Sequence, residues 1–425
     1  MADLIARRPE QSLPRQAQQW ADLKAAYRFL NNDRVQVQQI GEPHRTLTFE
    51  QCARHSVVLC VQDDSDLCAA RIESEQYVMH STLAVVPTGQ LLGLLQQRFF
   101  PRVRQPSGET RKQRAARWRE SDVWEEAVQE IGSSRSACRF IHVADRAADN
   151  LRFMHACVRK EVGFVVRAKQ DRRVNQATDR LWAHLAAEPS RGVTTASVGT
   201  QRNRYGRITR RGREAKLAVR WAPVALDEPW NCHEKHDGPL RVNVVYLSEI
   251  DPPAGVESVE WMLLSSEPVN NLEQALTVVR YYLCRWVIEE WHRALKEGCR
   301  LEESQLEEGS ALMRLTAVLS VIATRLIQLR DLAENKSQEP EVLRATVPPL
   351  WIVIVSALAK IETAMLTPQT FWQTIARQGG WLGRKGDGRP GWKAIWFGWR
   401  EVHQMVKGAE LAQGTNKKTT LAQCG

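Results

Sequence analysis

Three runs of apolar and β-branched residues predict buried strands in the N-terminal half of the chain. The runs are HSVVLCVQD at residues 55–63, CRFIHVAD at 138–145 and GFVVRA at 163–168. Short continuous apolar runs of this kind are typical of strands that are covered on both faces. The first two runs end on aspartates, Asp63 and Asp145. We therefore expect a buried sheet that carries carboxylates at the polar ends of two strands.

Helices and a hairpin are predicted around these strands. Two apolar runs within residues 80–97 flank the turn Pro87-Thr88-Gly89, which predicts a hairpin. Residues 16–31 and 121–131 have apolar positions at helical spacing. A chain order of strand, hairpin, helix, strand, helix and strand is typical of an α/β sheet domain.

The pattern changes twice in the rest of the chain. Residues 170–260 contain short strand candidates separated by polar loops, which predicts a β-rich insertion. Six arginines lie in residues 202–213. A basic hairpin that runs along DNA and an ordinary solvated hairpin both explain them. From about residue 340 the pattern is helical, and a stripe of tryptophans there indicates core packing or a subunit contact. The stripe consists of Trp392, Trp396 and Trp399.

The charge of the chain favours an acidic partner. Lys and Arg number 59 against 49 Asp and Glu, which gives a formal net charge of +10 at pH 7. An excess of positive charge favours a polyanion, although many basic proteins bind none. The nine cysteines include no CxxC pair, which fits reduced thiols in the cytosol. The longest apolar run, residues 347–359, is shorter than the roughly 20 residues that a membrane span needs, so we expect a soluble cytoplasmic protein.

The stretch YYLCRWVIEEWHRALKEG at residues 281–298 carries the strongest chemical signal. It has no helix breaker, and a helix that turns about 100° per residue brings its polar side chains onto one face and its apolar ones onto the other. The polar face consists of Tyr282, Arg285, Glu289, Arg293 and Lys296, and the apolar side of Leu283, Val287, Trp291, Ala294 and Leu295. A carboxylate among cationic groups suits a site where phosphates approach a metal ion. An ordinary surface helix with i,i+4 ion pairs explains the same spacing.

Carboxylates from separate elements are what two-metal cleavage of a phosphodiester needs, because they must converge on ions roughly 3.5–4 Å apart. Asp63 and Asp145 share the alternation of the apolar residues before them, so both can project from the same face of the sheet. Glu289, on a helix packed against that sheet, completes the set. The competing carboxylates are Asp64, Asp66 and Asp149. Each of these aspartates can also be an ordinary residue at the start of a loop.

The spacing Y-x2-R-x3-E-x6-K resembles the signature of the insertion-sequence-four family of DDE transposases, and the transposon-five branch in particular. It is formed by Tyr282, Arg285, Glu289 and Lys296. The resemblance implies an α/β fold with an RNase H-like catalytic core that is interrupted by a β-rich insertion and followed by an α-helical C-terminal domain.

Four further segments are similar to the family in the same order along the chain. QDDSDL at residue 62 resembles the segment of its first aspartate, and VADRAAD at residue 143 that of its second. EWMLLSSEPV at residue 260 resembles the strand before the signature helix, and GRKGDGRPGW at residue 383 its C-terminal region. The resemblance therefore extends over nearly the whole chain.

The resemblance implies roles for particular residues. The catalytic, metal-binding acids are Asp63, Asp145 and Glu289, which would hold two Mg²⁺ ions with Mn²⁺ as a substitute. Trp261 matches a tryptophan that stacks on a flipped base, a role that suits its ring, whereas an ordinary core tryptophan explains it as well. The other residues expected to contact DNA are Tyr282, Arg285, Arg293, Lys296, Arg146 and Arg167.

The resemblance also implies a division of the chain and an activity. We expect an N-terminal helical remnant of a DNA-binding region at residues 1–50, the core at 51–335 with its insertion at about 170–260, and a helical dimerisation domain with a tail at 336–425. The implied activity is cut-and-paste transposition of an insertion sequence through a DNA hairpin, by a homodimer that binds transposon ends and target DNA.

Two departures from the family pattern bear on the site, and a third on the alternatives. Ala147 stands where the family has Glu, and Asp64 stands where it usually has a short hydroxyl residue. The DNA-binding region is shortened, which motivates the alternative of an N-terminally truncated, catalytically silent DNA-binding or inhibitor protein. A plain RNase H-like nuclease without strand transfer is the third possibility.

Overall fold

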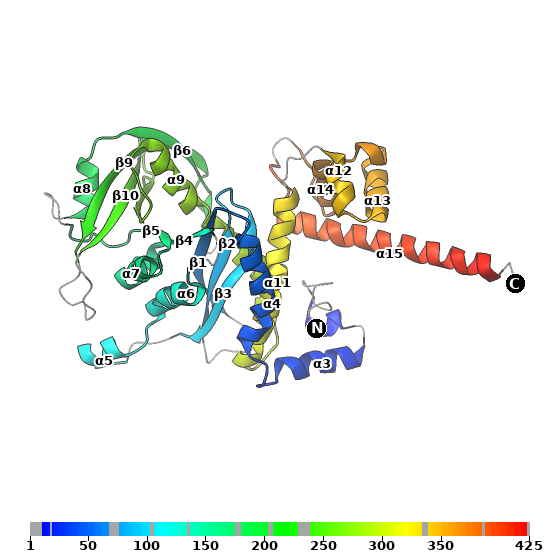
Figure 1. Cartoon of the computed structure of the whole chain (residues 1–425). Helices are drawn as coiled ribbons and strands as arrows, with labels where there is room; N and C mark the ends of the chain where they lie inside the picture. The colour runs from blue at the N-terminus through cyan, green and yellow to red at the C-terminus, as the bar shows by residue number, and fades with distance from the viewer. Residues whose placement is uncertain are drawn as a thin grey trace. The chain divides into compact units, whose positions relative to one another are not determined.

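The computed structural model describes residues 11–422, apart from residue 18 and the segments 68–75, 103–105, 134–136, 175–179, 203–206, 228–238, 334–338 and 385–386. The chain divides into two compact units, which are shown in Figure 1. The first unit comprises Met1–Gly41, Ala69–Glu73 and Glu290–Gly425, and the second comprises Glu42–Cys68 and Ser74–Glu289. All three predicted acids therefore belong to the second unit.

The second unit is built on a nine-stranded sheet in the order β3-β2-β1-β4-β5-β11-β10-β9-β6. Strands β1 (Val57–Leu67), β4 (Arg139–Ala144) and β5 (Gly163–Arg167) are parallel neighbours. The predicted hairpin, β2 (Tyr77–Val85) and β3 (Leu91–Pro101), adds to β1 antiparallel. The α/β sheet predicted from the apolar runs is therefore present.

The β-rich insertion extends this same sheet. Strands β9 (Arg213–Leu226) and β10 (Leu240–Glu249) pair with each other, and β10 pairs with β11 (Glu260–Ser265), which returns beside β5. Strand β6 (Gly192–Val198) forms the edge of the sheet. The insertion also carries α8 (Leu181–Ala187) and the short pair β7 (Gln201–Arg202) and β8 (Ile208–Arg210).

Alternate residues of the strands divide the sheet into two faces. Val58 and Cys60 of β1 join a large apolar core with Trp124 of α6 (Val123–Ile131) and Phe153 of α7 (Leu151–Arg159). Because side chains alternate along a strand, the odd-numbered residues of β1 lie on the other face. Helix α9 (Leu272–Leu283) packs along β5, β10 and β11. The unit also contains α5 (Arg111–Ala116) and most of α4 (Val37–Cys52).

The first unit is helical. Its elements include α2 (Leu13–Gln16), α3 (Trp20–Leu30), α11 (Gly309–Ala333), α12 (Pro340–Thr346), α13 (Pro349–Ala359), α14 (Pro368–Gln378) and α15 (Trp392–Ala422). The buried Arg314 of α11 holds the C-terminal end of α3, because its guanidinium donates to the carbonyl oxygen of Leu30 at 2.8 Å and to Asp33 Oδ1 at 3.1 Å. A cation at this end also complements the helix dipole.

The tryptophan stripe of α15 contributes to the core of this unit. Trp392 is buried, and the ring of Trp399 stacks on that of Trp351 with centroids 4.1 Å apart and on that of Trp372 at 5.6 Å. These contacts favour core packing for the two residues at the ends of the stripe. Trp396 is half-buried.

One helix has the length and composition of a membrane span. Gly309–Gln328 of α11 is a 20-residue stretch that contains an 18-residue window with a mean hydropathy of 1.5, and 78% of that window is buried inside the structure. A core helix of a soluble protein passes the same test, and the burial favours that explanation.

The crossing of α14 and α15 depends on glycine, which gives a first prediction. A Cβ atom on Gly398 would overlap the carbonyl oxygen of Ile375. We expect Gly398→Ala to destabilise this unit by about 1–3 kcal/mol, because backbone on both sides must move. Thermal unfolding followed by circular dichroism measures the effect.

The matched control is Gly408→Ala on the same helix, where an added Cβ meets nothing within 4 Å. Replacing a helical glycine by alanine without a clash should stabilise by about 0.5–1 kcal/mol. Equal effects of the two substitutions would contradict the close crossing.

Candidate active site

Asp63 and Asp145 lie on adjacent parallel strands and on the same face. The last pair in the register of β1 and β4 joins Val61 to Val143, and each aspartate follows its valine by two residues. Alternation therefore gives both carboxylates the direction that the sequence predicted. Asp145 directly follows the end of β4, as expected. The prediction that Asp63 ends its strand is wrong, because β1 stays paired with β2 up to Leu67.

The backbone around each aspartate fixes its carboxylate. Asp145 caps a short 3₁₀ turn, since its Oδ1 accepts a hydrogen bond from the amide of Ala147 at 2.7 Å. Asp63 Oδ1 accepts from the amide of Asp64 at 2.9 Å. Carboxylates held by strand backbone keep a fixed position, which is what a metal site requires.

Burial makes the Asp63 carboxylate costly to ionise. It raises the pKa of Asp63 from 3.8 to about 7, and the neighbouring Asp145 raises it as well, although Arg285 acts in the opposite direction. Two neighbouring carboxyl groups in a poorly solvated site ionise together readily only when a cation binds between them. The electrostatics of this edge therefore favour cation binding.

Arg285 connects Asp63 to Glu289. Its Nη1 lies 3.2 Å from Asp63 Oδ2, and its Nη2 lies 2.5 Å from Glu289 Oε1. Only 9% of Arg285 is exposed. The structure thus brings the third predicted acid to the first through one guanidinium.

The single helix predicted over residues 281–298 is wrong. Helix α9 ends at Leu283, α10 (Trp286–Arg293) begins after a turn at Cys284 and Arg285, and the last residues, Ala294–Gly298, form a π-helical turn. The turn arises because the amide of Arg285 bonds to the carbonyl of Tyr282, three residues back, at 3.0 Å. The break exposes Leu283, which was predicted on the apolar side. The other four predicted apolar residues, Val287, Trp291, Ala294 and Leu295, are buried.

Aromatic residues surround this turn. The rings of Trp261 and Tyr282 lie 5.9 Å apart at 59°, with Tyr282 buried and Trp261 partly exposed. The Cζ atom of Arg285 lies 5.3 Å from the ring centre of Trp286, which is 55% exposed. Trp286 was not among the residues predicted for the site, and its position directly after Arg285 in the signature was the available signal.

The remaining basic residues predicted to contact DNA have different surroundings. Arg146, next to Asp145, is exposed, whereas Arg167 Nη2 donates to the carbonyl oxygen of Glu260 at 2.9 Å. Arg293 is exposed, and Lys296 Nζ lies 3.2 Å from Glu302 Oε1. Arg293 and Lys296 belong to the other compact unit, so their convergence with the acids stays a prediction.

The three competing aspartates have other partners. Asp66 pairs with Arg102. Asp149 is buried, and its carboxylate accepts from the amides of Lys169 and Gln170 and from Arg172, which lies 2.6 Å from Oδ1. These contacts leave Asp149 with little capacity for a metal ion. Asp64 lies on the opposite face of the sheet from Asp63.

Asp64 begins a chain of buried polar groups across three strands. Its Oδ1 lies 2.6 Å from His80 Nδ1, and His80 Nε2 lies 3.1 Å from Gln62 Oε1. The Gln62 amide nitrogen lies 2.5 Å from Nδ1 of His142, and burial lowers the pKa of His142 to about 3. His142 is thus neutral. The unusual aspartate at position 64 therefore serves the core behind the site and not the site itself.

No group of three or more acidic, histidine or cysteine side chains converges for metal binding in the described part of the chain. Between two of the predicted acids, Asp63 and Glu289, lies the guanidinium of Arg285. A place where two carboxylates already share one cation has the charge that a divalent ion needs. The carboxylate oxygens of Asp63 and Glu289 are therefore of the kind that a divalent metal binds.

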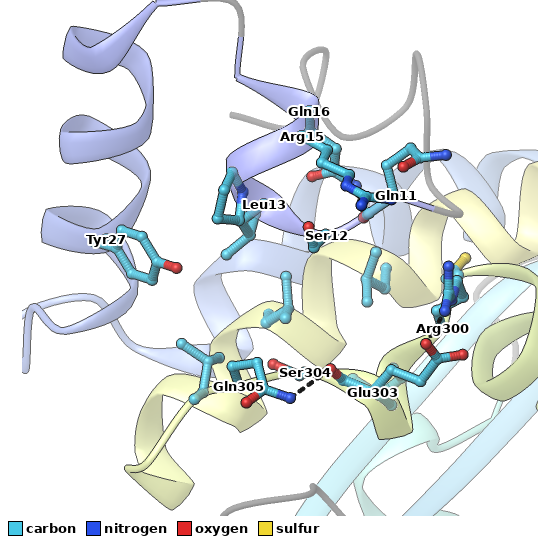
Figure 2. A pocket seen from close by; sticks show the side chains of 16 residues that line it. Gln11, Ser12, Leu13, Arg15, Gln16, Tyr27, Arg300, Glu303, Ser304 and Gln305 are labelled. Carbon is cyan, nitrogen blue, oxygen red and sulfur yellow. Dashed lines mark hydrogen bonds and ion pairs between the residues drawn. The ribbon is translucent and has the colours of Figure 1, made fainter.

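A cavity of about 370 Å³ in the first unit is separate from these carboxylates (Figure 2). Side chains from residues 11–16, Tyr27 and the segment 299–306 line it together with α11. None of the predicted site residues is among them. The cavity therefore contributes nothing to the chemistry of the acids.

The chain matches three protein-family models. A transposase DNA-binding model matches residues 1–35, a transposase DDE domain matches residues 116–323, and a transposase Tn5 dimerisation domain matches residues 331–419. Asp145 and Glu289 lie within the DDE match, and Asp63 lies before it. These matches do not favour the alternative of a truncated, catalytically silent protein.

The mixed sheet carries Asp63 and Asp145 on adjacent parallel strands, and the DDE match covers the second of these strands, so the protein falls in the RNase H-like DDE class of DNA-processing enzymes. The chain belongs to the Tn5-like DDE transposases, since transposase DNA-binding, DDE and Tn5 dimerisation models match successive parts of it. The fold predicted from the sequence is thereby confirmed.

The raised pKa of Asp63 predicts a stability effect that depends on pH. A carboxyl whose folded pKa of about 7 exceeds its ordinary value of 3.8 stabilises the fold below the lower value, and this contribution is lost as the pH rises to the higher one. Without divalent cations, Asp63→Asn should therefore stabilise the protein more at pH 8 than at pH 5.5, with a difference on the order of 1 kcal/mol.

Urea unfolding in a chelator at the two pH values measures this difference. Asp66→Asn, which removes an exposed carboxylate from the same strand, is the control and should show no such difference between pH values. An equal effect of Asp63→Asn on the free energy of unfolding at both pH values would show that the pKa of Asp63 is not raised.

The polar chain predicts that Asp64 matters for folding and not for catalysis. Asp64→Ala leaves His80 Nδ1, which is buried, without its acceptor and should destabilise the protein by about 1–3 kcal/mol. Asp64→Asn keeps an acceptor oxygen and should cost less. Both variants, assayed where they remain folded, should retain the activity of the unmodified protein, and a total loss with Asp64→Asn would place this carboxylate in the active site.

Proposed function

We propose that this protein is a cut-and-paste transposase whose acids Asp63, Asp145 and Glu289 cleave transposon ends and join them to target DNA. The observation that carries the proposal is the pairing of Asp63 and Asp145 on one face of adjacent parallel strands, with Glu289 joined to Asp63 through Arg285. Acids from three separate elements at one edge are the arrangement that phosphodiester chemistry of this kind requires.

The three acids would hold the metal. Bound there, two Mg²⁺ ions, with Mn²⁺ as a substitute, would activate water or a DNA 3′-OH and stabilise the leaving oxygen. The protein's own contribution is a rigid ligand set: Asp63 is fixed within β1, and Asp145 is fixed by the amide of Ala147. Rigid ligands keep the reacting phosphate in line for displacement.

The basic and aromatic residues would hold the DNA end. Arg146 is exposed beside Asp145, so its guanidinium is free to approach a phosphate. Trp261 lies partly exposed beside the ring of Tyr282 and offers a face on which an unstacked base can rest. A flipped base would relieve the tight turn of a DNA hairpin intermediate, which is the route that we propose for release of the flanking DNA.

A homodimer would hold both ends of the element. The dimerisation match at residues 331–419 supports this arrangement, and the DNA-binding match at residues 1–35 supports recognition of the ends. Binding should weaken steeply with salt, because each neutralised phosphate releases counterions.

The test is cleavage and strand transfer on DNA that carries the element's own termini. We expect Asp63→Asn, Asp145→Asn and Glu289→Gln each to abolish both products while DNA binding persists, because the charge that holds the metal is lost and the fold is kept. Gel analysis of end-labelled DNA with Mg²⁺ or Mn²⁺ separates nicked, hairpin and joined species.

Asp66→Asn is the matched control and should remain active, since Asp66 pairs with Arg102 away from the acids. Cleavage without joined products would favour a plain nuclease. Full activity of any of the three acid variants would remove that residue from the site.

A further inference from the structure

The cation that lies between Asp63 and Glu289 is the guanidinium of Arg285. The two terminal nitrogens of Arg285 reach one carboxylate each, at 3.2 Å and 2.5 Å. A divalent metal binds carboxylate oxygens at about 2.0–2.1 Å and needs the space between them. The guanidinium and a metal shared by these two acids therefore exclude each other.

Arg285 has an unused donor in this position. Its Nε atom is buried and makes no hydrogen bond within the described part of the structure. A guanidinium prefers two parallel bonds to one carboxylate or phosphate, whereas here its two terminal nitrogens are divided between two separate acids. A phosphate that offered paired oxygens would satisfy Nε and one Nη together.

The surroundings of Arg285 suit a side chain with two positions. Arg285 lies in the turn between α9 and α10, outside the regular hydrogen bonding of either helix. Its guanidinium also faces the half-exposed ring of Trp286 at 5.3 Å, which attracts a cation at the rim of the site. When the guanidinium moves from Asp63 and Glu289 toward an incoming DNA strand, it therefore stays beside the ring of Trp286.

We propose that Arg285 is an internal counter-ion that blocks metal loading until a DNA phosphate draws it away from Asp63 and Glu289. DNA binding and metal binding are then coupled: DNA removes the competing cation, and metal releases the guanidinium for DNA. Such coupling is reciprocal by thermodynamic linkage. It confines a nuclease centre to protein that already holds its substrate.

This inference rests on the proposed function, because it takes Asp63 and Glu289 as the metal ligands. The experiment is a titration of the full-length protein with Mn²⁺, in which electron paramagnetic resonance measures the free ion. It is performed without DNA and with duplex DNA carrying the element's termini, before products accumulate, and the titration of DNA alone is subtracted.

Arg285→Gln removes the cation and keeps a polar side chain, which is shorter than that of arginine. We expect it to bind Mn²⁺ about 5- to 50-fold more tightly than the unmodified protein in the absence of DNA, which is the usual range of coupling between sites. DNA should tighten Mn²⁺ binding by a similar factor in the unmodified protein and by little in the variant. Arg285→Lys keeps a charge that cannot span both acids and should be intermediate.

The controls separate the possible failures. Arg280→Gln removes an exposed arginine of α9 that bonds to Thr277, and it should leave Mn²⁺ affinity unchanged. If Asp63→Asn and Glu289→Gln leave Mn²⁺ binding unchanged, the proposed ligand set is wrong.

If those two variants lose Mn²⁺ and folded Arg285→Gln binds it no more tightly than the unmodified protein, the counter-ion role is wrong and the proposed function stands. Folding is checked by circular dichroism. If Arg285→Gln does not fold, Arg285→Lys decides in the same way.

Discussion

The parallel pairing of β1 with β4 is the constraint on which the rest of this structure depends. Because the two strands run in the same direction with Val61 opposite Val143, their next outward-facing residues on that side are both aspartates. No loop has to bring the carboxylates together. Burial, with a smaller contribution from Asp145, raises the pKa of Asp63, and a guanidinium from the α9–α10 turn that lies against Asp63 acts in the opposite direction. The chemistry of the edge thus follows from strand register.

The same register organises the opposite face. Positions 62 and 64 of β1 point away from the acids, into the layer that contains Trp124 and Phe153. Buried polar groups there contact one another in a chain from Asp64 through His80 and Gln62 to His142 across three strands, and His142 Nε2 at its end has no hydrogen-bond partner among the described residues. Strand β1 therefore supplies the candidate catalytic acid Asp63 from one face and two members of the polar chain, Gln62 and Asp64, from the other.

Much of this arrangement could be predicted from the sequence, and the reasons are local. Apolar runs ending on acids predicted β1 and β4, and alternation predicted that Asp63 and Asp145 share a face. What could not be predicted was how far β1 extends, because its pairing with β2 up to Leu67 is a contact between strands. The role of Asp64 was equally hidden, since its partner His80 lies on another strand and only the fold brings them together.

The segment that carries Glu289 shows what periodicity alone could not predict about the local geometry. An uninterrupted helix would have placed Tyr282 and Arg285 on the same polar face as Glu289. In the structure α9 ends at Leu283, Tyr282 is buried beside Trp261, and Arg285 lies against Asp63. Helix propensity contains no information about such a break, because it depends on packing against the sheet. Arg285 and Glu289 keep the i,i+4 pairing that a continuous helix also allows, and Arg285 reaches Asp63 as well, so one guanidinium joins the third acid to the first.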